Sequence, residues 1–473
     1  MMSWLLAIGA TLWLIKSFRR EPAFFLVAIF LSWQFALKVY GVSFLDSFGP
    51  IFSDEVSTEV GGNGYSAPLM ILFVMIPLAA MKLAMRMVSN KDLPLVEKNL
   101  AQSWLTFGDL IATVLVVFLI CLYVDFFRIG QIPLFDRMER FEYKGGVFHV
   151  FLVTYLFLIA HAIGFVLART RLLTGVWDVR FAGIVFGLFT YLFLTGHRFG
   201  SFYVLLSFAM VPMAALFVAP RMGLAVAKPP RKRSVLQRMA SSRMIITGFA
   251  LVLVSIVLIA MANSLLNVRD GDPQDVLLQR FLVQPVHLYW LSWERLENGE
   301  IEGIGAAAHF IFKDPFDAAR NSGIQYLMSL HLGLNRAVEI WEGQEVDYAG
   351  GYPEILIELG GVWLAIAAAV LASVAIAALY RLAVVAVCRG QFLLSMMSMY
   401  VCFGVLNLFL GGMVTFITAE TYWLKLGALA LMVLLSRSSP RSTGRLFPWV
   451  LIPRGKLHRP ALPSLRSSRK ATQ

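Results

Sequence analysis

The sequence has few charged residues and almost no cysteine. Only 15% of its 473 residues are charged, whereas a soluble domain has about 25%. Its three cysteines, Cys121, Cys388 and Cys402, show no spacing typical of a disulfide framework or a metal site. The composition therefore argues against a soluble enzyme, and the cysteines predict neither a disulfide scaffold nor a bound metal.

Sequence motifs for nucleotide binding, metal binding and nucleophilic catalysis are also missing. The chain has no phosphate-binding loop with its lysine, no dinucleotide fingerprint, no HExxH pair and no nucleophile elbow. It also has no convincing DxD. We therefore expect no cofactor, no metal and no nucleotide donor.

Apolar residues are abundant instead. They make up 58% of the chain, and the mean hydropathy is +0.72. Apolar runs recur along the sequence, and about 11 of them approach the roughly 20 residues that cross a bilayer core. The predicted fold is all-α, a polytopic transmembrane helical bundle. The runs cover 3–15, 23–40, 67–87, 105–127, 147–168, 181–196, 202–219, 244–263, 352–380, 392–411 and 421–436.

The basic residues predict the orientation of the bundle. Lys and Arg are enriched on the cytoplasmic side of an inner membrane. If the N-terminus lies outside and the spans alternate, most basic residues fall inside, including the run at 228–243, and most acidic residues fall outside. The net charge of +12 then reflects topology, and anionic membrane lipid is the expected partner of the basic segments rather than nucleic acid. We expect a multi-pass protein of the bacterial inner membrane.

This topology divides the chain into four parts. Residues 1–263 form eight spans with short loops, and 264–351 form a large periplasmic loop region of short helices. Residues 352–436 form three more spans, and 437–473 form a basic cytoplasmic tail. The large loop is too short and too apolar to be an independent domain, so it must pack on the membrane region. We expect the active site on the periplasmic side.

One stretch of the large loop, 276–296, is predicted to be an amphipathic helix. Arg280, His287 and Glu294 are spaced to share one of its faces, and Pro285 kinks it or starts a second helix. One interpretation is an interfacial helix with a solvated polar stripe. The other is a helix that lines a cleft and offers a cation, a titratable imidazole and a carboxylate.

A glycine-rich segment at 350–361 leads into the next span. Glu354 and Glu358 lie one helical turn apart on it. An unpaired carboxylate near the membrane interface is costly, so Glu358 needs an arginine partner or a polar cavity. A structural ion pair is the alternative to a functional role.

Arginines recur in the segments predicted to lie outside. Arginine keeps its charge when it loses water and forks onto phosphate oxygens, so several together would suit a lipid-linked phosphate or pyrophosphate and stabilise a leaving group. A nearby carboxylate or imidazole could take the proton of an acceptor hydroxyl. Taken singly, each arginine also fits an exposed loop charge. The set comprises Arg137, Arg140, Arg198, Arg280, Arg320 and Arg336.

Four places in this order resemble a known family. They are Gly130-Gln-Ile-Pro-Leu-Phe135 with the arginines that follow, Gly196-His-Arg-Phe-Gly-Ser201, Arg280-Phe-Leu-Val-Gln-Pro285, and the glycine-rich segment at 350–361. With the large late loop, they make the chain similar to the Wzy-type polysaccharide repeat-unit polymerases, which include O-antigen polymerases.

The resemblance implies a metal-independent glycosyltransferase of the GT-C type. Such a protein transfers an undecaprenyl-pyrophosphate-linked glycan to the terminal sugar of another lipid-linked repeat unit at the periplasmic face. A chain-length regulator and a flippase are further partners that it implies. Some members carry an arginine followed ten residues later by glycine, and that spacing does not follow Arg280, Arg320 or Arg336.

Carried over to this chain, the resemblance makes Arg280 the first candidate for pyrophosphate contact. Arg198 and Arg137 come next, and the general base is to be chosen among His287, Glu294 and Glu354. Two other functions stay open. An O-antigen ligase uses the same donor with a lipid A core acceptor. A secondary transporter or lipid-oligosaccharide flippase usually shows inverted repeats or broken helices.

Overall fold

The computed structural model describes residues 2–62, 66–87, 101–133, 143, 145–197, 199–224, 275, 278–301, 303–305, 322–343 and 350–438. The described chain is almost entirely helical, and one two-stranded hairpin is the only sheet within it. The all-α prediction is therefore confirmed for these residues.

The long helices coincide with the predicted apolar runs. Among the described residues, seven helices are long and apolar enough to cross a membrane. The run at 244–263, the basic run at 228–243 and the tail beyond 438 lie outside the described residues. The helices are α1 (Met2–Arg20), α2 (Pro22–Phe48), α3 (Ser66–Met87), α4 (Ala101–Ile129), α6 (Val147–Thr174), α7 (Val179–Leu194), α8 (Phe199–Met210), η2 (Val211–Ala214), α9 (Ala215–Val218), η3 (Pro220–Met222), α17 (Glu354–Arg389), α18 (Phe392–Gly411), α19 (Thr415–Thr418) and α20 (Glu420–Ser438).

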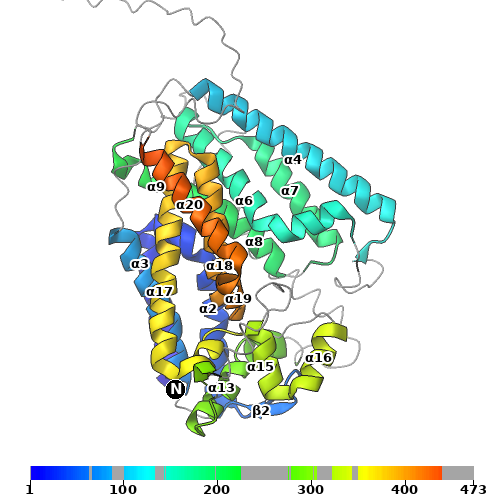
Figure 1. Ribbon diagram of the computed structural model, residues 1–473, viewed down its shortest axis with the longest axis vertical. Coiled ribbons are helices and arrows are strands. Elements are labelled where there is room, and N and C mark those ends of the chain that lie inside the picture. The colour runs from blue at the N-terminus through cyan, green and yellow to red at the C-terminus, as the bar shows by residue number, and fades with distance from the viewer. Residues whose placement is uncertain are drawn as a thin grey trace, which may run out of the picture.

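The helices form two groups (Figure 1). In the first, α17 packs against α3 and α18, α2 packs against α1 and α3, and α20 packs on α18. In the second, α6 packs on α8 and α4, and α7 lies against α4. Phe157 of α6 stacks on Phe403 of α18 with ring centroids 4.0 Å apart, so apolar packing joins the two groups.

Small residues bring helix backbones into contact. A Cβ added at Gly164 of α6 would lie 2.1 Å from the carbonyl oxygen of Ala209 in α8. Such close approach is typical of helix pairs in membranes, where dispersion contacts replace the hydrophobic effect. On the outer face of α4, Leu110, Val117 and Val124 are exposed, as expected of a helix that faces lipid.

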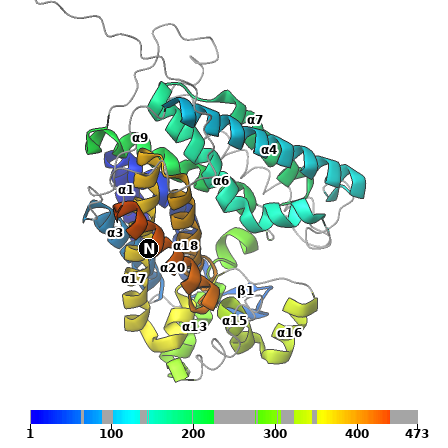
Figure 2. The ribbon, with the colours of Figure 1, turned by 45° about the horizontal axis from the view of Figure 1, so that its top comes forward.

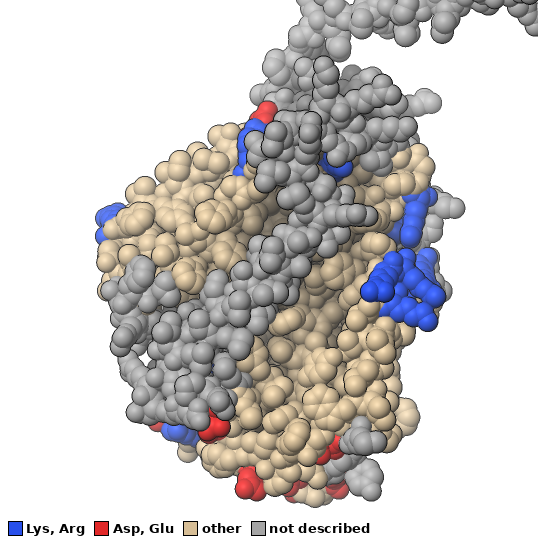
Figure 3. Space-filling view, turned by 180° about the vertical axis from the view of Figure 1, so that it is seen from behind, with Lys and Arg blue, Asp and Glu red and all other residues tan. Residues whose placement is uncertain are grey.

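The remaining elements gather at one end of the bundle, which we call the loop end (Figures 1 and 2). They pack with the end of α2 and the start of α17. Figure 3 shows acidic residues at the loop end and most basic residues nearer the opposite end. The elements are β1 (Ile51–Ser53), β2 (Thr58–Val60), η4 (Gln279–Val283), α13 (His287–Glu297), α15 (Ser322–Leu332) and α16 (Leu334–Gly343).

Candidate functional site

The segment that leads into α17 runs across the loop end. Helical dihedral angles are interrupted at Gly360 and Gly361, so Glu354 and Glu358 lie on a short first part of α17 that differs in direction from the long part (Figure 1). Gly361 has a φ of +72°, a backbone region that glycine enters without steric cost. Because of this break, the first part of α17 belongs to the loop end and the long part continues as a spanning helix.

Close contacts between glycines hold this segment against its neighbours. A Cβ added at Gly351 would lie 2.2 Å from the carbonyl oxygen of Gly411, and one added at Gly323 would lie 2.1 Å from that of Gly412. Gly351 also has a φ of +105°. The start of α15, the approach to α17 and the end of α18 therefore meet backbone to backbone.

Glu354 is fully buried and paired with a lysine from a spanning helix. Lys38 Nζ of α2 lies 3.0 Å from Glu354 Oε1 and 3.3 Å from Oε2, and only 6% of the Lys38 side chain is exposed. The same ammonium group donates to the carbonyl oxygen of Tyr352. Breaking a buried pair leaves an uncompensated charge, so these contacts lock the approach to α17 onto α2.

Glu358 has the arginine partner that its predicted position required. Arg295 Nε of α13 lies 3.1 Å from Glu358 Oε1, and Arg295 also donates to the Glu300 carbonyl oxygen over 2.9 Å. The Glu358 side chain is fully buried. This second pair fixes α13 onto the first part of α17.

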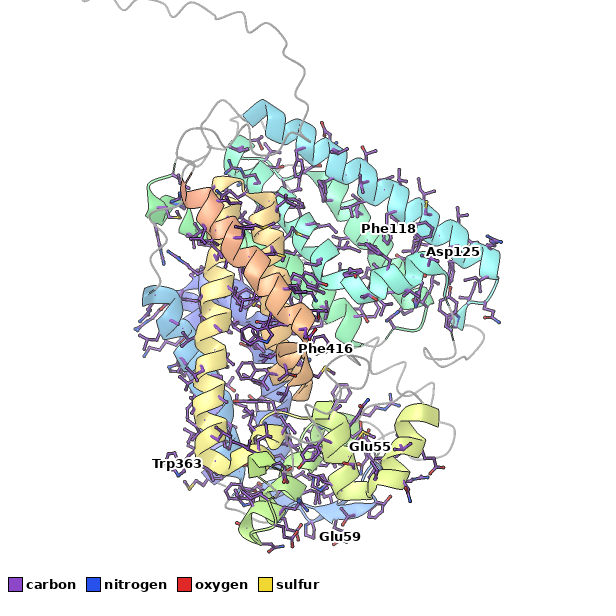
Figure 4. All side chains as sticks on the ribbon, in the orientation of Figure 1. Glu55, Glu59, Phe118, Asp125, Trp363 and Phe416 are labelled. Carbon is purple, nitrogen blue, oxygen red and sulfur yellow. The ribbon has the colours of Figure 1, made fainter. Side chains whose placement is uncertain are left out.

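His287 is fully buried at the start of α13. Its Nδ1 lies 3.3 Å from Ser53 Oγ and its Nε2 lies 3.5 Å from Glu55 Oε2, and Figure 4 shows Glu55 at the loop end. Burial lowers the pKa of His287 to about 3, and the charges of His331 and Lys38 act in the same direction. The Glu55 carboxylate favours the protonated form, but desolvation is the larger effect. His287 is therefore neutral at neutral pH.

The segment at 276–296 is not one continuous helix, as one of the two possibilities for Pro285 predicted. The chain forms the π-helical turn η4, then a turn, and then α13. Pro285 has no N–H to continue the first helix, which bears out the alternative of a second helix. His287 and Glu294 are seven residues apart on one face of α13, but His287 at the start of the helix is buried whereas Glu294 is exposed.

Arg280 is half-buried on η4, and that turn is tightly anchored. Gln279 Nε2 donates to the carbonyl oxygen of Phe52 in β1 over 2.6 Å. A Cβ added at Gly41 of α2 would lie 2.6 Å from the Leu282 carbonyl oxygen. The position of the Arg280 backbone is thus set by α2 and the hairpin together.

The other predicted arginines divide into two kinds. Arg336 is exposed on α16, and its Nη1 lies 2.6 Å from Glu339 Oε2. The remaining four lie outside the described residues, namely Arg137, Arg140, Arg198 and Arg320. The structure thus brings Arg280, His287 and Glu354 to the loop end, with Glu294 and Arg336 on its outer surface.

Sequence reasoning missed the partners Lys38, Glu55 and Arg295. A signal existed for Lys38, since it is the one basic residue within the apolar helix α2, and a charge inside a span normally has a partner or a function. Within the described part of the chain, no group of three or more His, Cys, Asp or Glu side chains could hold a metal ion.

One family model matches the chain, over residues 317–424, and its description is Family of unknown function (DUF6418). The matched part includes α15, α16, α18, the approach to α17 and both buried glutamates, but neither Arg280 nor His287. No curated protein and no solved structure matches the chain.

Proposed function

We propose that this protein polymerises undecaprenyl-pyrophosphate-linked oligosaccharide repeat units into a surface polysaccharide such as O-antigen. The observation that most supports this is the placement of Arg280 at the loop end, on a rigid turn packed against the spanning helix α2. A lipid-linked pyrophosphate sits at a membrane surface, and an arginine held there is suited to grip it.

The proposed orientation places the loop end in the periplasm of a bacterium, with about 11 spans in the inner membrane. Exposed acidic side chains at the loop end, such as Glu59 and Glu294, and exposed basic side chains at the opposite end, such as Arg19 and Arg20, support it. Membrane lipids surround the bundle, and a flippase and a chain-length regulator are the further proposed partners.

The proposed reaction needs neither metal nor cofactor. The acceptor hydroxyl oxygen attacks the anomeric carbon of the donor glycan, and the bond from that carbon to the pyrophosphate oxygen breaks. The lipid-linked pyrophosphate leaves with the electron pair of the broken bond, and a base takes the proton of the acceptor hydroxyl. Arg280 stabilises the leaving group, with Arg198, Arg137, Arg140, Arg320 and Arg336 as further candidates.

Two alternatives predict different products. An O-antigen ligase would transfer the same donor glycan to lipid A core, which yields capped core without chain lengthening. A flippase is favoured by one observation, the interrupted helix at Gly360 and Gly361, because transporters often bind substrate at broken helices. Here the break adjoins the loop end rather than the middle of the span, which favours the transferase.

The test uses a strain that lacks the gene, complemented with wild-type or variant protein. Wild-type protein should restore a ladder of polysaccharide lengths on a gel. Arg280→Ala should reduce the product to single repeat units, whereas Arg280→Lys, which keeps the charge but loses the fork, should give a shortened ladder. Glu339→Gln on the exposed surface is the control, with an expected normal ladder. An unchanged ladder in the deletion strain would refute the proposed function.

A further inference from the structure

Four arginines gather at the end of the bundle opposite the loop end, where α9 packs against α6 and α17 (Figures 1 and 2). Arg381 and Arg389 belong to α17, Arg169 to α6, and Arg221 to η3, which follows α9. Arg381 is near enough to Arg221 to interact with it electrostatically. We call these four residues the arginine cluster. It joins three elements that are distant in sequence.

Cys388 near the end of α17 lies among three of these arginines. Its Sγ lies 3.7 Å from the carbonyl oxygen of Ala215 in α9, and it is within electrostatic range of Arg169, Arg381 and Arg389. Arg169 Nη1 donates to the Cys388 carbonyl oxygen over 2.6 Å, so one guanidinium group caps the end of α17. The dipole of a helix supplies only about half a negative charge at that end, which is too little to balance the whole arginine cluster.

Burial makes these charges costly unless an anion accompanies them. Arg389 is 4% exposed and Arg169 is 8% exposed, and buried charges are normally paired. Arg381 lies about two helical turns before the end of α17, and its Nε is buried without a hydrogen-bond partner. Among the residues that the structure describes, no carboxylate forms an ion pair with Arg381 or Arg221. The described protein therefore leaves positive charge in the arginine cluster that an anion can neutralise.

Arg180 shows how another arginine at the same end is neutralised by the protein itself. It lies at the start of α7, just after the connection that follows α6. Its Nη1 lies 2.7 Å from Asp109 Oδ1 and its Nη2 lies 2.6 Å from Asp178 Oδ2. Arg180 is exposed and has two carboxylate partners, whereas the more deeply buried arginine cluster has a different charge balance.

We propose that the arginine cluster binds the phosphate group of an anionic membrane lipid. Arginine keeps its charge when it loses water and forks onto phosphate oxygens, and basic pockets between spanning helices suit anionic lipid headgroups. A lipid is the source of the phosphate because Arg381 lies within a spanning helix, where the ligand approaches from the bilayer. The bound phosphate would balance the repulsion between the guanidinium groups and hold α6, η3 and α17 together. This inference does not depend on the proposed glycosyl transfer.

The test is a titration of the full-length protein in neutral detergent with phosphatidylglycerol, and with phosphatidylcholine as the lipid without net charge. Wild-type protein should bind phosphatidylglycerol more tightly. Arg381→Gln should weaken that binding by about tenfold or more, as loss of a charge-assisted hydrogen bond does. Arg381→Lys keeps the charge but loses the fork, so its affinity should fall between the two. Arg180→Gln is the matched control and should bind within about twofold of wild type.

A second measurement uses the wild-type protein alone, so it does not depend on the folding of a variant. Phenylglyoxal modifies accessible guanidinium groups, and mass spectrometry reads the modified positions. Phosphatidylglycerol should slow the modification of Arg381 and Arg221 but leave that of Arg180 unchanged, and phosphatidylcholine should protect none of them.

Three results would overturn the inference. The first is the same rate of modification of Arg381 with and without phosphatidylglycerol. The second is a monodisperse Arg381→Gln protein that binds this lipid within about twofold of wild type. The third is inorganic phosphate that protects Arg381 as well as the lipid does, which would show a site for free phosphate rather than for a lipid.

Discussion

Lys38 and Glu354 are 316 residues apart in sequence, and their charged groups lie 3.0 Å apart in the interior of the loop end. Lys38 belongs to a spanning helix and Glu354 to the segment that leads into another. The pair therefore fixes the loop end onto the spanning helices.

Removing one member of this pair should be costly. Lys38→Met leaves the buried Glu354 carboxylate unpaired and should lower the free energy of unfolding by about 3–5 kcal/mol. The double variant Lys38→Met/Glu354→Gln should recover much of that loss, because no buried charge remains. Unfolding in detergent micelles measures both. The exposed pair of Arg336 and Glu339 is the matched control, and Glu339→Gln should cost less than about 1 kcal/mol.

Substitution of a glycine in the close contacts at the loop end should also lower stability. Gly351→Ala adds a Cβ that meets the Gly411 carbonyl and also forces alanine into a φ of +105°. We expect a loss of about 2–4 kcal/mol in unfolding free energy. Gly183→Ala on α7, with no atom within 4 Å of the added Cβ, should instead stabilise by about 0.5–1 kcal/mol. Equal effects of the two substitutions on the melting temperature would contradict this account.

Acid should destabilise the loop end through its buried histidines. The pKa of His287 is lowered to about 3 and that of His331 to about 4, in both cases chiefly by burial. Below a pH of about 6.5, the ordinary pKa of histidine, the unfolded chain then binds more protons than the folded one. The full contribution is present above that pH and is lost as the pH falls from about 6.5 toward 3, by at most about 1.4 kcal/mol per pH unit for each residue.

Melting temperatures between pH 7.5 and 5 measure this effect. His287→Gln should flatten the decline with falling pH, because glutamine does not titrate. A His287→Gln protein with the same pH dependence as wild type would show that other groups cause the acid sensitivity.

The proposed orientation can be tested by labelling. With Cys121, Cys388 and Cys402 replaced by alanine, Glu59→Cys on the exposed hairpin should react with a membrane-impermeant maleimide in intact spheroplasts. Arg19→Cys at the opposite end should react only after the membrane is permeabilised. The reverse pattern would place the loop end in the cytoplasm.

The apolar runs predicted the helices well because a bilayer core demands long apolar segments. The run at 392–411 coincides with α18. The run at 23–40 ended too early, since α2 continues to Phe48. Its polar last turns are satisfied by α1, where Trp4 Nε1 donates to Ser47 Oγ over 2.8 Å. Such a hydrogen bond joins residues that are distant in sequence, so no local sequence pattern predicts it.

The site was harder to predict because its partners are distant in sequence. Periodicity placed Arg280, His287 and Glu294 on one face, but the break around Pro285 separates Arg280 on η4 from the other two on α13, where His287 is buried and Glu294 exposed. The need of Glu358 for a cation was predictable from the cost of burying a carboxylate. That the cation is Arg295 depended on the packing of α13 against α17, which the sequence pattern does not encode.

The break at Gly360 and Gly361 divides α17 into a first part that belongs to the loop end and a long part that forms a span. Trp363, two residues beyond Gly361, is 82% exposed and projects from the side of the molecule (Figure 4), as an aromatic anchor at a membrane interface does. A thicker or thinner bilayer is accommodated by helix tilt. Because the break at Gly360 and Gly361 lies between this anchor and Glu358, the long span can lean without rotating Glu354 and Glu358 away from their cations. The packing of the loop end is therefore the same in membranes of different thickness.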